Sequence, residues 1–216
     1  MAGTRVDGRV ERGNQTRRLV LRRTMDIASV EGLEGLSLGR IAGELGLSKS
    51  GVFALFGSKE ELQLATVRAA GAVFAKTVVV PVQEQPPGVG RLLALCAHWL
   101  RYSRERVFPG GCFFYGAAAE FASRSGPVHD AVAAAHRDWA AYVQQTAEEA
   151  RTAGELRPET DPAGLAFELI ALLEHANLLS LLHGSQDAYD LAATAVVTRL
   201  RAAAADPGSV PDALPG

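Results

Sequence analysis

Residues 36–62 read LSLGRIAGELGLSKSGVFALFGSKEEL, and this stretch contains the start and stop signals of consecutive short helices. A serine precedes each helical pattern, and serine side chains cap helix N-termini by accepting a backbone N–H. These serines are Ser37, Ser48 and Ser58. Gly46 and Gly57 follow the first two patterns, because glycine tolerates the positive φ that ends a helix. The stretch therefore predicts helices that begin after each serine.

The first two of these helices suit a helix-turn-helix, in which Ala42 is small enough for a close crossing and Gly46 supplies the turn. One face of the second helix is apolar and suits burial: Val52, Leu55 and Phe56. The opposite face is small and carries one charge: Lys49, Ser50, Phe53 and Ala54. Such a surface can enter the major groove of DNA. The alternative is a compact three-helix core that contacts no DNA.

Positive charge gathers at the same end of the chain. Residues 1–60 have a net charge of +3 and the remainder −5, which fits a nucleic-acid-binding head on an acidic body. Ser48 and Lys49 suit phosphates because the free N–H groups of a helix N-terminus attract anions. Lys59, at the start of the next helix, suits another phosphate.

The quoted stretch and its flanks, residues 16–64, strongly resemble the DNA-binding domain of TetR-family (tetracycline-repressor-type) transcriptional regulators. The resemblance places Ser37 and Arg40 near the DNA backbone and Lys59 on a phosphate. The full set of expected DNA contacts is Ser37, Arg40, Ser48, Lys49, Ser50, Phe53, Ala54 and Lys59. The family often has tyrosine at the position of Phe53 and a larger polar residue at that of Ala54, so fewer side chains are expected to read bases here.

The rest of the chain predicts longer helices and no sheet, for an all-α fold of about nine helices. We expect a flexible arm over residues 1–14, a helix-turn-helix domain over 15–60, a ligand-binding and dimerisation domain over 61–205, and a flexible tail over 206–216. Prolines in the tail and glycines in the arm motivate the two flexible assignments.

One two-turn recognition helix gives little specificity, and two-fold dimers solve this by binding two half-sites of a palindrome. The helix over residues 162–183 has an unusually wide apolar surface that suits such a dimer, together with the last helix. The expected interface residues are Leu165, Leu169, Leu172, Leu173, Ala176, Leu179, Leu191, Val196 and Leu200. The alternative is that both helices are internal core, and the resemblance favours the homodimer.

A sensing pocket for a small apolar or amphipathic effector is expected among the middle helices. Candidate lining residues are Trp99, Tyr102, Cys112, Phe113, Tyr115, Phe121, Trp139, Tyr142 and His175. The alternative is that these side chains are plain core. The resemblance implies that an effector shifts the population toward a form whose recognition helices no longer match the operator.

Other functional classes have weak support. The sequence has no phosphate-binding glycine loop or nucleophile elbow, so neither a catalytic residue nor a cofactor is expected, although a helical enzyme or an adaptor without DNA binding stays an alternative. His129 and His136 are seven residues apart and His175 and His183 eight, which does not suit a helical metal site. Cys96 and Cys112 are weak redox candidates.

The sequence shows no uninterrupted apolar run of about 18 residues and no signal-peptide pattern. With only two cysteines, these features predict a reduced, cytoplasmic protein with no membrane partner. The predicted function is a sequence-specific DNA-binding regulator, expected to be a repressor that an effector releases from a palindromic operator. The effector, the operator sequence, the regulated genes and the number of dimers on each operator stay open.

Overall fold

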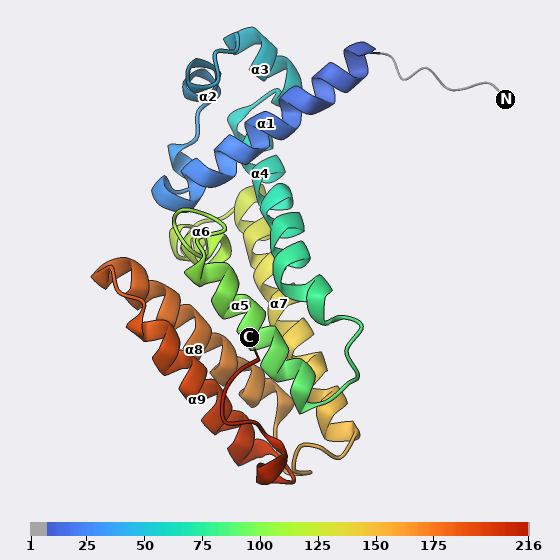
Figure 1. The fold of residues 1–216 in the computed structure, drawn as a ribbon. Helices are drawn as coiled ribbons and strands as arrows, with labels where there is room; N and C mark the ends of the chain where they lie inside the picture. Colours follow the sequence, from blue (N-terminus) through green and yellow to red (C-terminus); the bar gives the residue numbers. More distant parts are fainter. Residues whose placement is uncertain (1–7, 216) are drawn as a thin grey trace, which may run out of the picture.

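The computed structural model describes residues 8–215, and in this part of the chain nine α-helices carry the fold and no named strand occurs (Figure 1). The α-helices are α1 Gly8–Glu31, α2 Leu38–Glu44, α3 Lys49–Phe56, α4 Lys59–Phe74, α5 Val89–Arg104, α6 Phe113–Phe121, α7 Pro127–Thr152, α8 Pro162–His183 and α9 Asp187–Ala203. Shorter helical turns are η1 Leu33–Gly35, η2 Ala75–Val79 (a π-helix), η3 Val80–Val82 and η4 Pro207–Ser209. The predicted all-α class is confirmed.

The serine caps explain where the short helices begin. The side chain of Ser37 accepts a hydrogen bond from the Arg40 N–H, and Ser48 accepts one from the Gly51 N–H. Ser58 caps α4 in the same way. Gly46 has φ +63° in the turn after α2, a conformation that costs glycine nothing sterically. The predicted starts of α2, α3 and α4 are therefore confirmed.

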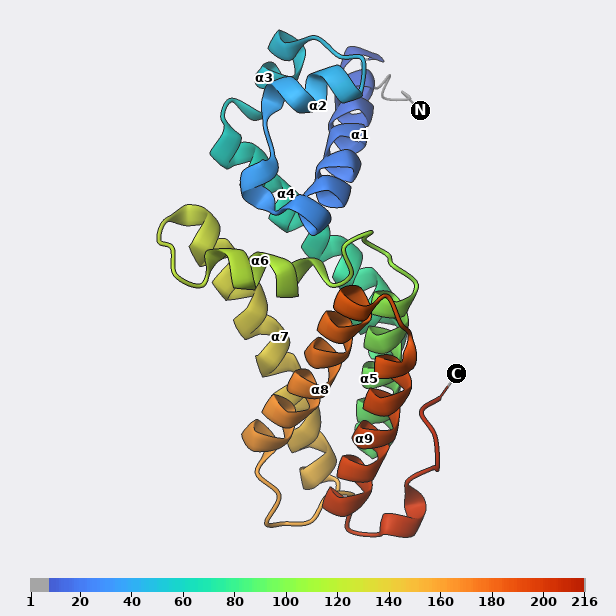
Figure 2. The same ribbon diagram turned by 90° about the vertical axis from the view of Figure 1, so that its left-hand side faces the viewer.

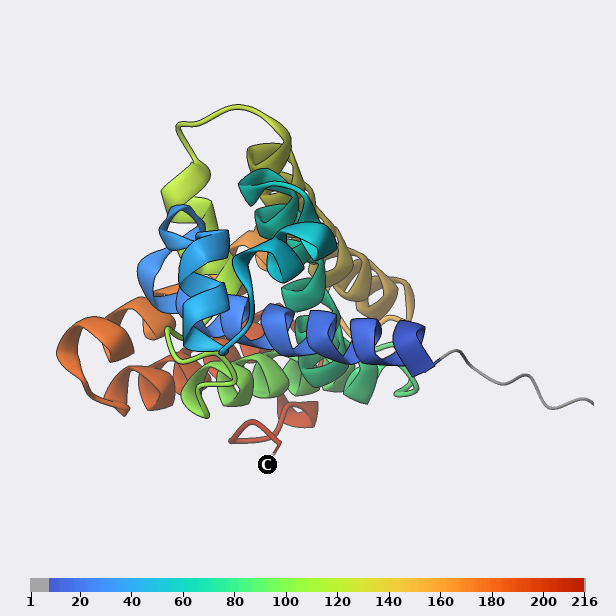
Figure 3. The same ribbon diagram turned by 90° about the horizontal axis from the view of Figure 1, so that it is seen from above.

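The elements form two units joined by α4. Helices α1, α2 and α3 form one end of the molecule, and α4 runs from them into a larger unit built from α5 to α9 (Figures 1 and 2). Seen from above, α2 and α3 lie nearest the viewer, with the larger unit behind them (Figure 3). The buried hydroxyls of Thr66 and Thr24 are hydrogen-bonded at 2.9 Å and tie α4 to α1. Helices α2 and α3 lie at the end of the molecule away from the larger unit, so one face of these two helices is not covered by it.

Both segments expected to be flexible differ from that prediction. Residues 8–14 of the expected arm belong to α1, while residues 1–7 lie outside the described residues. A glycine such as Gly13 costs a helix only about 1 kcal/mol, which the flanking helix formers offset. Residues 206–215 of the expected tail fold back, with Val210 buried and the Arg201 guanidinium donating to the Val210 carbonyl oxygen at 3.1 Å. Val210 belongs to the hydrophobic core, which the prolines of the tail do not indicate.

Two helical stretches, Lys59–Val82 and Pro162–His183, reach the length and mean hydropathy of a membrane span. The sequence-based expectation of no membrane span rested on the absence of an uninterrupted apolar run. Glu168 and Glu174 interrupt the apolar residues of α8. Both stretches are partly buried inside the protein, and core helices of soluble proteins have the same composition.

Candidate functional site

Helix α3 has one buried face and one free face. Val52 and Phe56 are buried against the rest of the α1–α3 unit, and Leu55 is half-buried. The free face consists of Lys49, Ser50, Phe53 and Ala54, all exposed. Phe53 is 56% exposed, so its ring is accessible to another molecule. The predicted division of the helix into two faces is confirmed, and contact of the free face with DNA stays a prediction.

Arg17, on α1, fixes the end of α3. Its guanidinium donates to the Leu55 carbonyl oxygen at 2.7 Å and lies 4.5 Å from the centre of the Phe56 ring. Arg18 and Arg22 follow on the same helix, and both are exposed without an ion pair among the described residues. These two arginines add exposed positive charge to α1, and neither belongs to the predicted set of DNA contacts.

Two of the predicted DNA contacts are held by carboxylates of the protein itself. Arg40 donates to Glu31 Oε1 at 2.7 Å and to Glu44 Oε1 at 2.8 Å. The hydrogen bond from Arg40 lowers the pKa of each carboxyl. Lys59 Nζ donates to Glu34 Oε2 at 3.0 Å, which lowers the pKa of Glu34. The side chains of Arg40 and Lys59 stay partly exposed beside these carboxylates.

The larger unit contacts the α1–α3 unit through α6. Oε2 of Glu120, on α6, accepts the Leu33 N–H at 2.7 Å, and Oε1 accepts the Glu34 N–H at 2.9 Å. Gly110, just before α6, donates its N–H to Ser29 Oγ at 3.0 Å. A Cβ at Gly110 would lie 1.8 Å from the Ser29 carbonyl oxygen, so only glycine fits there. Movement of α6 therefore acts directly on the segment between α1 and α2.

A buried polar network holds the start of α6 to α8 and α9. Asn177 Oδ1 accepts the Cys112 N–H at 2.9 Å and the Ser103 hydroxyl at 2.8 Å. Arg106, which has φ +52°, donates to the Tyr189 hydroxyl at 2.9 Å. A non-glycine residue at positive φ is strained, and these hydrogen bonds compensate for it. The position of α6 thus depends on the face of the molecule that carries α8 and α9.

A cavity of about 320 Å³ that is partly open to solvent lies between α4, α5, α6, α7 and α8. We call it the aromatic cavity; its lining residues are Gly71, Phe74, Ala75, Val79, Trp99, Cys112, Phe114, Ala135, His136, Asp138, Trp139, Tyr142 and Glu174. The Phe74 ring meets those of Trp139 and Phe114 edge-on, with centroids 5.1 and 5.9 Å apart. Its volume falls at the small end of the range for ligand sites.

One carboxylate lines the wall of the aromatic cavity. Burial raises the pKa of Glu174, and the nearby His136 opposes that shift. Glu174 Oε1 lies 3.5 Å from His136 Nε2, beyond the length of a strong hydrogen bond. Asp138 adds a second, exposed carboxylate to the lining.

Four of the nine predicted pocket residues line the aromatic cavity: Trp99, Cys112, Trp139 and Tyr142. Tyr102, Phe113 and Phe121 are instead buried in the core, and Tyr115 and His175 line a groove on another face. The prediction omitted Phe74, Phe114, His136 and Glu174. The helical spacing of aromatic residues does not distinguish side chains of the core from side chains that line a cavity. No sequence pattern around Glu174 indicates that its side chain is partly buried.

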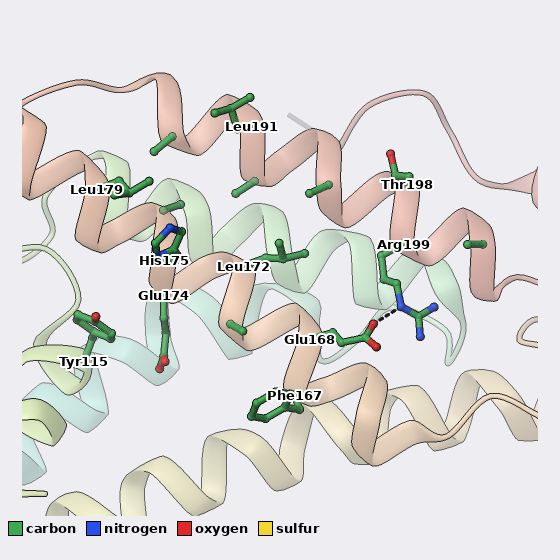
Figure 4. A pocket seen from close by; sticks show the side chains of 16 residues that line it. Tyr115, Phe167, Glu168, Leu172, Glu174, His175, Leu179, Leu191, Thr198 and Arg199 are labelled. Carbon is green, nitrogen blue, oxygen red and sulfur yellow. Dashed lines mark hydrogen bonds and ion pairs between the residues drawn. The ribbon is translucent and has the colours of Figure 1, made fainter.

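An apolar groove of about 1200 Å³ runs along α8 and α9 (Figure 4). Phe167 is 76% exposed and Leu191 is 70% exposed, and both line it. Glu168 and Arg199 form an ion pair across the groove between the two helices. The other lining residues are Tyr115, Ala171, Leu172, Glu174, His175, Ala176, Leu179, Ala188, Ala192, Ala195, Thr198 and Ala202. A soluble protein rarely leaves so much apolar surface uncovered.

Several residues expected at the dimer interface are placed elsewhere. Five are buried inside the subunit away from the groove: Leu165, Leu169, Leu173, Val196 and Leu200. Ala176 is also buried but lines the floor of the groove. Leu172, Leu179 and Leu191 are accessible in the groove, as is Phe167, which the prediction omitted. Because α8 is apolar on all sides, its sequence cannot tell which side faces the subunit's own core.

The cysteines and histidines form no reactive cluster in the described part of the chain. Burial raises the pKa of the Cys112 thiol to about 11 and that of Cys96 to about 12, so both thiols stay protonated at neutral pH. Among residues 8–215, no group of three or more His, Cys, Asp or Glu side chains is arranged to hold a metal ion.

Comparison with known families covers both units of the chain. Residues 20–66 match the family model described as bacterial regulatory proteins, tetR family. Residues 88–196 match the model described as tetracyclin repressor-like, C-terminal domain. No curated protein matches the sequence.

Solved structures share the fold over nearly the whole chain. A TetR transcriptional regulator from Chloroflexus aurantiacus J-10-fl is 25% identical, with a TM-score of 0.83 over 90% of this chain and 98% of that chain. A TetR-family regulator from Cytophaga hutchinsonii is 21% identical, with a TM-score of 0.80 over 90% and 98%. AibR, solved in complex with isovaleryl coenzyme A and operator DNA, is 21% identical, with a TM-score of 0.62 over 76% and 85%.

Proposed function

The chain belongs to the tetR family of bacterial regulatory proteins and is a DNA-binding, ligand-responsive regulator, and on this premise we propose that α3 reads an operator while the aromatic cavity binds the effector. The observation that carries the DNA contact is Phe53, exposed at the centre of a small, polar helix face. Its ring can contact thymine methyl groups in the major groove. An enzyme or a DNA-free adaptor is disfavoured by the family, and we propose no catalytic activity.

The contacts with DNA divide by role. Ser50, Phe53 and Ala54, exposed on α3, face the bases. The residues near the phosphates are Ser37, Ser48, Lys49, Arg40 and Lys59. The last two exchange their carboxylate partners for phosphate oxygens. Residues 15–60 thus form the DNA-binding domain and residues 61–205 the sensing and dimerisation domain, in a protein that acts in the bacterial cytoplasm.

The second copy that completes the operator complex packs on the groove along α8 and α9. Phe167 and Leu191 are exposed there and suit a self-complementary apolar interface. A dimer places two copies of α3 for two half-sites about one helical turn apart, and so requires a palindromic operator. Repression follows when such a dimer covers a promoter.

Effector binding reaches the DNA contacts through α6. Cys112 and Phe114, at the start of α6, line the aromatic cavity, and Glu120 near its end binds the backbone of η1. A ligand that displaces Phe114 therefore biases the position of Glu120 and of the helices attached to η1. Release from DNA requires only that the effector prefer this displaced form.

Selection of bound sequences from a random DNA pool tests the function, followed by gel shift with the selected site. The unmodified protein should select a palindrome and bind it in a salt-dependent manner. Phe53→Ala should weaken binding at least tenfold, whereas Lys76→Ala, an exposed lysine on η2, should not. Recovery of random sequences, or equal binding by both variants, would contradict the proposal.

A further inference from the structure

The walls of the aromatic cavity combine rings with negative charge. Five of the lining side chains are aromatic: Phe74, Trp99, Phe114, Trp139 and Tyr142. The ionisable carboxyls are Glu174 and Asp138, and the lining set contains neither lysine nor arginine. The faces of aromatic rings carry negative potential, which attracts organic cations. The electrostatic character of the cavity is therefore that of a cation site.

Glu174 lacks a strong partner within the protein. Its carboxyl is desolvated by its surroundings, which raises its pKa, and its nearest basic group is the His136 ring at 3.5 Å. In Figure 4 its side chain points away from α9, on the side of α8 that faces the cavity helices. A partly desolvated carboxylate gains from a cation placed close to it, because an opposite charge at short range favours the ionised form.

Other classes of ligand fit less well. A carboxylate or phosphate ligand would meet two acidic side chains and no lysine or arginine in the lining. A neutral hydrocarbon would satisfy the rings but leave Glu174 with the His136 ring at 3.5 Å as its nearest basic group. The volume of about 320 Å³ also restricts the ligand to a compact molecule.

We propose that the effector is a small organic cation, an amine or quaternary ammonium on a compact apolar body, whose charge sits at Glu174 and whose body packs against Phe74, Trp99 and Trp139. This inference rests on the proposed function, because it names the class of molecule to which the regulator responds.

The chain offers a direct reporter for the test. It contains two tryptophans, Trp99 and Trp139, and both line the aromatic cavity. Intrinsic tryptophan fluorescence of the full-length protein is titrated with benzyltrimethylammonium, with its neutral isostere neopentylbenzene and with the anion phenylacetate. The cation should change the fluorescence saturably and bind at least tenfold more tightly than either control compound. Equal or tighter binding of the neutral compound or the anion, or no saturable response to the cation, would overturn the inference.

Substitutions of the two cavity carboxyls test where in the cavity the cation binds. Glu174→Gln should weaken binding of benzyltrimethylammonium at least tenfold and leave that of neopentylbenzene unchanged. Asp138→Asn, at an exposed position, should weaken cation binding by a smaller factor. It replaces Glu174→Gln in the test if Glu174→Gln fails to fold. The control is Glu148→Gln, which removes a carboxylate on α7 that does not line the cavity. Unchanged cation binding in both cavity variants, or an equal loss in the control, would place the cation elsewhere.

Gel shift with the selected operator separates this inference from the proposed function. Operator binding without cation binding refutes the effector class and leaves the regulator intact. Cation binding without operator binding supports the cavity chemistry and refutes the DNA-binding proposal.

Discussion

Glu120 on α6 and Leu33 in η1 are joined by a hydrogen bond of 2.7 Å from the Leu33 N–H to Glu120 Oε2, across 87 residues of sequence. The second carboxylate oxygen accepts the neighbouring Glu34 N–H at 2.9 Å. One side chain of the sensing unit thus caps a turn in the DNA-binding unit. It links the helix that lines the aromatic cavity to the segment between α1 and α2.

Glu120→Ala should uncouple the two units. Loss of a charged acceptor from two backbone N–H groups costs about 1.5 kcal/mol in the free energy of unfolding, the low end for such bonds because the site is partly solvated. The variant should keep an effector-binding cavity but show a smaller effector-induced loss of operator affinity, measured by gel shift with and without ligand. Glu159→Gln, an exposed glutamate between α7 and α8, is the control. A variant that responds to effector as fully as the unmodified protein would show that Glu120 carries no coupling.

A matched pair of glycines tests the close contact between the units. Gly110→Ala would place its Cβ 1.8 Å from the Ser29 carbonyl oxygen and should lower the free energy of unfolding by about 1–3 kcal/mol, the usual cost of overpacking. Gly116→Ala, on the exposed side of α6, meets no atom within 4 Å and should stabilise the helix by up to about 1 kcal/mol. Urea denaturation measures both. Equal stability of the two variants would contradict this packing of the segment before α6.

The ionisation of Glu174 should cost stability at neutral pH. Burial raises its pKa in the folded protein, so the folded state holds the proton more tightly than the unfolded state does. The penalty is absent below the unfolded pKa and develops as pH rises through the folded pKa. Glu174→Gln should therefore raise the urea midpoint at pH 7 and change it little at pH 4. A variant less stable than the unmodified protein at pH 7 would show that the His136 contact outweighs desolvation.

The groove along α8 and α9 should control the oligomeric state. Phe167→Glu places a charge where a second copy is proposed to pack, and should convert dimer to monomer in light scattering coupled to size exclusion. Far-ultraviolet circular dichroism should be unchanged, because Phe167 is exposed in the single subunit. Val80→Glu, an equally simple change at an exposed valine on η3, should leave the dimer intact. A dimeric Phe167→Glu variant would place the interface elsewhere.

Local features of the fold could be predicted from the sequence, and contacts between distant segments could not. Ser48 caps the start of α3 with its side chain, and Gly46 adopts the positive φ of the turn after α2, so a few neighbouring residues determine where these short helices begin and end. The bond between Glu120 and Leu33 depends on how α6 crosses η1, which no short pattern specifies. The two sides of α8 illustrate the same limit, because Leu169 and Phe167 are both apolar but only the first is buried.

Salt dependence of operator binding can count the copies of α3 on the DNA. Each phosphate neutralised by a basic side chain contributes about 0.9 to the slope of log affinity against log salt. Lys49 is exposed and has no ion pair among the described residues, so Lys49→Ala removes one such contact from each copy of the chain. The slope should therefore fall by about 1.8 for one bound dimer and by about 3.6 for two. Because Lys59 is shared with Glu34, Lys59→Ala should change the slope less. An unchanged slope in Lys49→Ala would mean that the N-terminus of α3 does not lie against the DNA backbone.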